Sequence, residues 1–129
     1  PFIQINKTTG IEFIYEIIKT GWKPIPNFHI FTASGETAFI SIEPHSAQQS
    51  QPGVYKTIMW VPENFLNDGF YTIGIAVSTL NPTVVHFCDY EALSIEVIDN
   101  LGSVTRSGYT GKIKGAVRPS MNWETKKIT

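Results

Sequence analysis

The sequence predicts an all-β domain, built as an antiparallel β-sandwich of the jelly-roll or immunoglobulin-like kind. Large apolar side chains alternate with small or polar ones in several segments, which is the period of a half-buried strand. Glycine, proline, asparagine and aspartate punctuate these segments, and no segment carries a helix-length pattern of period 3.6. The chain has 129 residues, of which 42% are hydrophobic and 16% charged, so one globular domain is expected.

The clearest strands are predicted in the second half of the chain. Residues 53–61 alternate until Pro62, which cannot donate to a sheet ladder. Residues 69–77 form a second alternating segment, with a short loop or single helical turn before it. Residues 93–97 alternate leucine, isoleucine and valine with serine and glutamate, and they predict a third strand.

The first half predicts further strands from weaker patterns. Two glutamates in residues 11–19 also permit a helix, but the flanking glycines and the alternating bulky side chains favour a strand. Residues 28–32 and 37–42 flank Ala-Ser-Gly-Glu and predict a hairpin. The segment 111–129 contains Pro119, which suits an edge strand better than a central one.

Composition and motifs argue against several classes of function. Ten Lys and Arg residues balance eleven Asp and Glu residues, so no basic excess indicates nucleic acid or an anionic membrane surface. No segment approaches the roughly 20 apolar residues of a membrane span. Catalytic and nucleotide-binding motifs are absent from the sequence, so neither an enzyme nor a cofactor is predicted.

The lone Cys88 excludes an intrachain disulfide and favours a reducing compartment. We expect Cys88 to be a small buried apolar residue. On a strand, His86 and Cys88 would share a face, which allows a metal pair in principle. A strand followed by an ordinary acidic turn at Asp89 and Glu91 is the favoured interpretation, so no metal site is predicted.

A more specific pattern combines four short motifs in a fixed order. These are Gly53-x-Tyr55 with Val61-Pro62, Gly69-x-Tyr71, the segment 92–99, and Arg118-Pro119 followed by Trp123-Glu124. Together they resemble the C-terminal carbohydrate-binding domain of Wzt-type proteins, the ATP-binding subunits of bacterial ABC transporters that export O-antigen polysaccharide. The resemblance covers residues 53–124, with a looser match over residues 11–42.

The resemblance implies a non-catalytic domain that recognises the non-reducing, often capped, end of an O-antigen polysaccharide before export. It implies a homodimer with an exchanged C-terminal strand, a part that the segment 111–123 could play. The chain, which begins at Pro1, would be the fragment of a longer protein. Its missing nucleotide-binding domain would work with a transmembrane permease at the cytoplasmic face of the inner membrane, without membrane insertion of this domain.

The alternation predicts a glycan site on outward-facing side chains. If the strands 53–61 and 69–77 pair, Lys56 and Trp60 stand beside small residues such as Thr72. His29 and Phe31 would share the outer face of a third strand. A sugar ring needs an aromatic surface and a few polar groups, and Lys56 suits an acidic sugar or a phosphate cap. The predicted groove therefore comprises His29, Phe31, Lys56, Trp60 and Thr72.

Each of these assignments has an alternative. Trp60, with neighbouring isoleucines, could instead form a dimer interface or lie under a loop. For His29 and Phe31, ordinary packing is the favoured interpretation, and Arg118 and Trp123 are expected to be structural. For the whole domain, the alternative to glycan binding is a purely structural dimerisation domain. A small β-sandwich hydrolase is the least favoured class.

Overall fold

The computed structural model describes residues 1–80 and 82–128, and almost all of its regular structure is β. Two short 3₁₀ turns, His45–Ala47 and Val104–Arg106, interrupt the connecting loops. The seven strands are β1 (Phe2–Gln4), β2 (Thr9–Ile17), β3 (Ile25–Thr32), β4 (Thr37–Ile42), β5 (Gly53–Val61), β6 (Gly69–Thr79) and β7 (Val84–Ile98).

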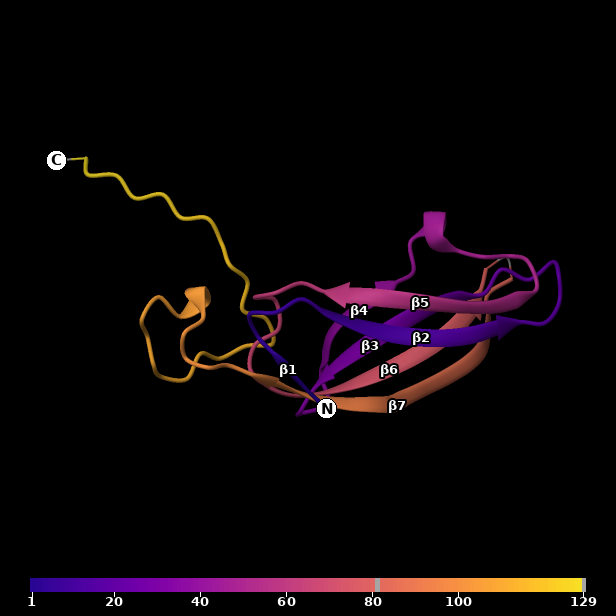
Figure 1. Ribbon diagram of the computed structural model, residues 1–129, viewed down its shortest axis with the longest axis horizontal. Helices are drawn as coiled ribbons and strands as arrows, with labels where there is room; N and C mark the ends of the chain where they lie inside the picture. The colour runs from indigo at the N-terminus through magenta and orange to yellow at the C-terminus, as the bar shows by residue number, and fades with distance from the viewer. Residues whose placement is uncertain (81, 129) are drawn as a thin grey trace.

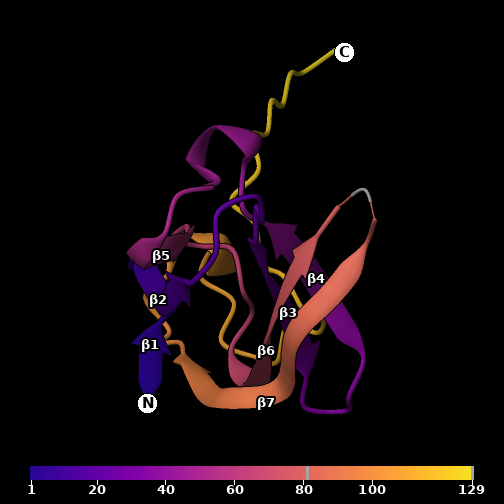
Figure 2. The ribbon, with the colours of Figure 1, turned by 90° about the vertical axis from the view of Figure 1, so that its right-hand side faces the viewer.

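The strands form two layers. A five-stranded sheet has the order β1-β7-β6-β3-β4, and a two-stranded sheet joins β2 to β5. Figure 1 shows β2 and β5 lying over the larger sheet, and Figure 2 shows the two layers from one end. The arrangement is a β-sandwich, as the sequence predicts. Its sheets are antiparallel except for the short β1, which pairs parallel to β7.

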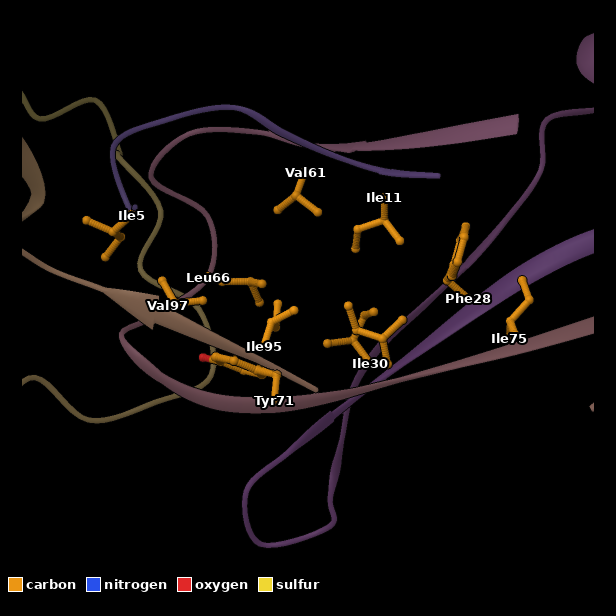
Figure 3. Close-up of a cluster of buried hydrophobic side chains, with 11 residues drawn as sticks. Ile5, Ile11, Phe28, Ile30, Val61, Leu66, Tyr71, Ile75, Ile95 and Val97 are labelled. Atoms are coloured by element: carbon orange, nitrogen blue, oxygen red, sulfur yellow. The ribbon is translucent and has the colours of Figure 1, made fainter. Parts of the chain in front are cut away.

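The core lies between the layers, and both sheets contribute to it. Ile11 and Val61 reach down from the smaller sheet toward Ile30 and Ile95 of the larger one (Figure 3). Tyr71 is buried in the same cluster, and its hydroxyl group lies 2.9 Å from the backbone oxygens of Asn67 and Ala116. The inward faces predicted from the alternation of β5 and β6 are therefore confirmed.

The strand boundaries confirm most of the predicted elements. The segments 11–17, 53–61 and 69–77 are strands, and 28–32 with 37–42 forms an antiparallel hairpin. However, β5 pairs with β2 and not with β6, so the pairing on which the five-residue groove depended is wrong.

The other corrections concern β7. The predicted acidic turn after His86 is absent, because β7 runs unbroken from Val84 to Ile98 and absorbs extra residues in irregular register opposite β6. Cys88 is exposed rather than buried. The strand predicted at residues 93–97 is thus only the final part of a strand of 15 residues.

A buried ionic cluster fastens the C-terminal segment to the sandwich. The Asp99 carboxylate, 2% exposed, accepts hydrogen bonds from the guanidinium groups of Arg106 and Arg118. Arg118 also donates to Asp68 at 2.7 Å. The Asn67 side chain donates to the backbone oxygens of Ile113 and Gly115, each at 2.7 Å. The expected structural role of Arg118 is confirmed.

Beyond Arg118 the chain leaves the body of the domain. Residues 119–128 carry no assigned strand, although an isolated bridge joins Val117 to Leu66. Figure 1 shows this tail extending away from both sheets. Trp123 is 87% exposed there, so it closes no sheet within this chain.

Candidate functional site

Three aromatic rings gather on the outer face of the larger sheet. His29 and Phe31 stack with ring centroids 6.2 Å apart, and Tyr90 lies 5.1 Å from His29 and 5.8 Å from Phe31. Tyr90 is 51% exposed, while His29 and Phe31 are half-buried. We call these three side chains, with Thr72, the aromatic platform.

Strand register places the platform residues together. Phe31 lies opposite Thr72 and His29 opposite Gly74 in the antiparallel pair of β3 and β6. Residues directly opposite each other share a face of the sheet. A Cβ atom on Gly74 would come within 2.8 Å of the Tyr90 Cα, so only glycine leaves room for β7 to bring Tyr90 over the sheet here.

Polar groups accompany the rings. Asn27 lies two residues before His29 on the same face, and its Oδ1 is 2.8 Å from His29 Nε2. This hydrogen bond fixes the orientation of the imidazole ring. On β7, the carboxylate of Asp89 accepts a hydrogen bond from the backbone N–H of Glu91 at 3.0 Å, which supports the chain around Tyr90. The platform therefore combines exposed ring surface with hydroxyl and imidazole groups, and Asn27 adds an amide group beside it.

Lys56 and Trp60 lie on the other layer. Both face outward on β5, as predicted, and Trp60 is 63% exposed. The Trp60 ring lies over Gly10 of β2, where a Cβ would approach its ring atoms to 3.0 Å. The Lys56 ammonium is 3.7 Å from the Glu12 carboxylate. Of the five predicted residues, the structure therefore brings together His29, Phe31 and Thr72, and it separates Lys56 and Trp60 from them.

Tyr90 is the platform residue that the sequence reading missed. A signal was available, because residues 84–90 are rich in β-branched and aromatic side chains and no Gly or Pro separates them from the predicted strand. Because acidic residues are rare in strand interiors, Asp89 and Glu91 predicted a turn, and Tyr90 was not assigned to a strand.

A larger cleft, about 690 Å³, opens where the end of β2 and the β6–β7 hairpin diverge. Trp22 meets His86 edge-on at 5.0 Å, and His86 Nε2 is 3.0 Å from Thr79 Oγ1. Apolar side chains dominate the lining. The platform offers a better balance of ring surface and polar groups for a hydroxyl-rich ligand.

Across residues 1–80 and 82–128, no group of three His, Cys, Asp or Glu side chains could hold a metal ion. Within those ranges no helix has the length and apolarity to span a bilayer.

The fold and this surface define a class: a β-sandwich domain whose larger sheet presents an exposed aromatic platform. Among solved structures, the chain is similar to the crystal structure of the C-terminal domain of Wzt. The TM-score is 0.71 at 13% sequence identity, and the match covers 96% of this chain and 73% of that one. The resemblance drawn from the sequence motifs is thus confirmed in the fold. No family model matches the chain, and no curated protein matches its sequence.

Proposed function

We propose that this chain is a non-catalytic carbohydrate-binding module that recognises the end of an O-antigen polysaccharide and selects it for export by an ABC transporter. The observation that carries the proposal is the aromatic platform on a sandwich with the fold of the Wzt C-terminal domain. The transporter context derives from that likeness, and the ligand chemistry derives from the platform.

The chemistry of the platform fits a sugar chain. The exposed part of the Tyr90 ring offers a surface for the C–H groups of a pyranose ring, which the negative face of a π-system attracts. Thr72 and the Asn27–His29 pair offer hydrogen-bonding groups beside the rings for sugar hydroxyls. The platform lies on the outer face of the larger sheet, and such a surface can accommodate a linear chain.

A binding comparison tests the proposal. The chain is titrated with capped and uncapped O-polysaccharides by calorimetry, and Tyr90→Ala is compared with Lys56→Ala. We expect only Tyr90→Ala to reduce binding strongly, since Lys56 lies on the outer face of the other layer. If no polysaccharide binds the parent chain, the glycan function is wrong.

We further propose that the module works as a homodimer that exchanges its C-terminal tail. A two-stranded sheet is marginal by itself, and the β2–β5 sheet has Ile14, Val54 and Trp60 exposed on its outer face. Met121 and Trp123 are also exposed and would share one face of an extended strand. A tail from a second copy could therefore add to this sheet and cover apolar surface on both chains.

In this proposal the remaining partners follow from the likeness to Wzt. A nucleotide-binding domain on the same polypeptide and a transmembrane permease would place the module at the cytoplasmic face of the inner membrane. The second candidate function is assembly alone, and the exposed tail favours it. Glycan binding to the aromatic platform distinguishes the two, because an assembly domain needs no such ligand.

A further inference from the structure

A second, smaller cleft lies where the sandwich opens between the edge of β4 and the edge of β5. Its volume is about 210 Å³, roughly seven water molecules at ~30 Å³ each, which is close to the size of one sugar ring. Ser41 from β4 and Thr57 from β5 line it from opposite sheets, together with Phe28, Met59 and Trp60. The register places Ser41 opposite inward-facing Phe28, and Thr57 opposite Phe13, so both hydroxyl-bearing side chains face the space between the layers.

The cleft also holds an unsatisfied buried carboxylate oxygen. Glu43 Oε1 is buried and has no hydrogen-bond partner among the described residues. The backbone around it is fixed, since the Glu43 N–H donates to the Pro26 oxygen at 3.0 Å and Gln48 Nε2 donates to the Glu43 oxygen at 3.2 Å. A buried acceptor without a donor is costly, and proteins retain such groups mainly where a ligand or another group satisfies them.

We propose that this cleft binds a single neutral sugar ring, with the Glu43 carboxylate accepting hydrogen bonds from its hydroxyl groups. A carboxylate is an acceptor only, so it requires a ligand rich in donors, and hydrogen bonds to a charged acceptor are the stronger kind. The Ser41 and Thr57 hydroxyls in the same lining can donate or accept, and Phe28, Met59 and Trp60 offer apolar surface to the C–H groups of the ring. The inference rests on the proposed glycan function and adds a subsite to it.

Backbone edges extend the polar lining. In the described chain, β4 pairs with β3 alone and β5 with β2 alone, so the two strand edges that flank the cleft have unpaired N–H and C=O groups. An extended segment from a second copy could also use such edges. A sugar is favoured because the cleft is small and its lining includes an acceptor-only carboxylate and two hydroxyl groups.

The test is a titration of the ¹⁵N-labelled chain with D-glucose, D-galactose and D-mannose, following the backbone amides of Ser41, Glu43 and Thr57. We expect saturable shifts of these amides with at least one of the three sugars. Glu43→Gln keeps the shape of the side chain and should weaken binding about tenfold, because a charge-assisted acceptor becomes a neutral one. Glu36→Gln, an exposed glutamate in the β3–β4 turn, is the matched control and should bind like the parent.

Three results would overturn the inference: no saturable shift with any sugar, equal binding by Glu43→Gln and parent, or cleft shifts that follow protein concentration instead of sugar. The last would show that a second copy occupies the cleft. Tyr90→Ala separates this inference from the proposed function. It should reduce polysaccharide binding while leaving the monosaccharide shifts of the cleft intact. Loss of the cleft shifts alone removes the subsite and leaves the platform standing.

Discussion

Tyr90 is the residue on which the platform depends most, because it is the most exposed of the three rings and contacts both others. Replacing Tyr90 with alanine should weaken binding of the cognate polysaccharide at least tenfold, or about 1.4 kcal/mol. Calorimetric titration measures this change. Phe2→Ala is the control, since Phe2 is an exposed aromatic residue on β1, which pairs with β7 only at residues 96–98. Equal losses from both substitutions would contradict a site at Tyr90.

Gly74 leaves the space that the Tyr90 backbone occupies against β6, and replacing this glycine tests how much the position of Tyr90 depends on it. An alanine Cβ would lie 2.8 Å from the Tyr90 Cα and 3.3 Å from the Asp89 oxygen, so β7 must move to accept it. We expect Gly74→Ala to cost about 1–3 kcal/mol of unfolding free energy and to weaken glycan binding through displacement of Tyr90. Urea unfolding gives the first quantity. Gly102→Ala should be nearly silent, because only the Asn100 side chain lies near its added carbon, at 3.5 Å.

At the scale of elements, Asp99 joins the end of β7 to the C-terminal segment. Burial alone would raise the pKa of Asp99, but hydrogen bonds from Arg118, Arg106 and the Leu101 backbone outweigh it and hold the pKa below the usual 3.8. Removing the charge with Asp99→Asn leaves two buried guanidinium groups short of a partner. The expected cost is about 3–5 kcal/mol, measured by urea unfolding near pH 7.

The same carboxylate predicts a pH dependence. A group whose pKa is lower in the folded chain than in the unfolded chain contributes stability above its unfolded pKa. That contribution declines as the pH falls through the folded pKa. The parent should therefore lose stability below about pH 4, and Asp99→Asn should lose less over that range. Parallel pH slopes for the two proteins would show that Asp99 is not the group responsible.

Features set within a single strand could be predicted from the sequence, whereas features set by contacts between strands could not. The alternation of β5 and β6 fixed their inward faces, because side-chain direction follows from the strand period. Which strands pair was not available from the pattern. The loop at 63–68 is short enough for a hairpin, but β5 crosses to the other layer and joins β2. The prediction thus placed His29, Phe31 and Thr72 on the correct face of one sheet. It wrongly placed Trp60 and Lys56 on that same sheet, although they lie on β5 of the other.

The irregular register of β7 could not be predicted from the sequence pattern either. It depends on Gly74 opposite the extra residues, which is a contact between strands and not a property of either strand alone. The acidic residues at 89 and 91 therefore predicted a turn, and no site role was predicted for Tyr90 between them. The fold class itself needed only local alternation and turn residues, and it was confirmed.

For the whole molecule, the exposed tail predicts a dimer. A chain ending after Ser120 should be monomeric by light scattering while the parent is dimeric, since Met121 and Trp123 would no longer cover the β2–β5 sheet of a partner. Trp123→Ala should weaken the dimer, and Lys112→Ala, outside the tail, should not. A parent that is monomeric at high concentration, or a shortened chain that remains dimeric, would contradict tail exchange.

The central claim is that the platform of His29, Phe31, Thr72 and Tyr90 binds a polysaccharide, while the outer face of the β2–β5 sheet at Lys56 does not. The most direct measurement is calorimetry of one O-polysaccharide with parent, Tyr90→Ala and Lys56→Ala, all shown to have the parent's melting temperature. The account predicts at least a tenfold loss for Tyr90→Ala and near-parental affinity for Lys56→Ala. Retained affinity in Tyr90→Ala, with loss in Lys56→Ala, would contradict it and move the site to the outer face of the β2–β5 sheet.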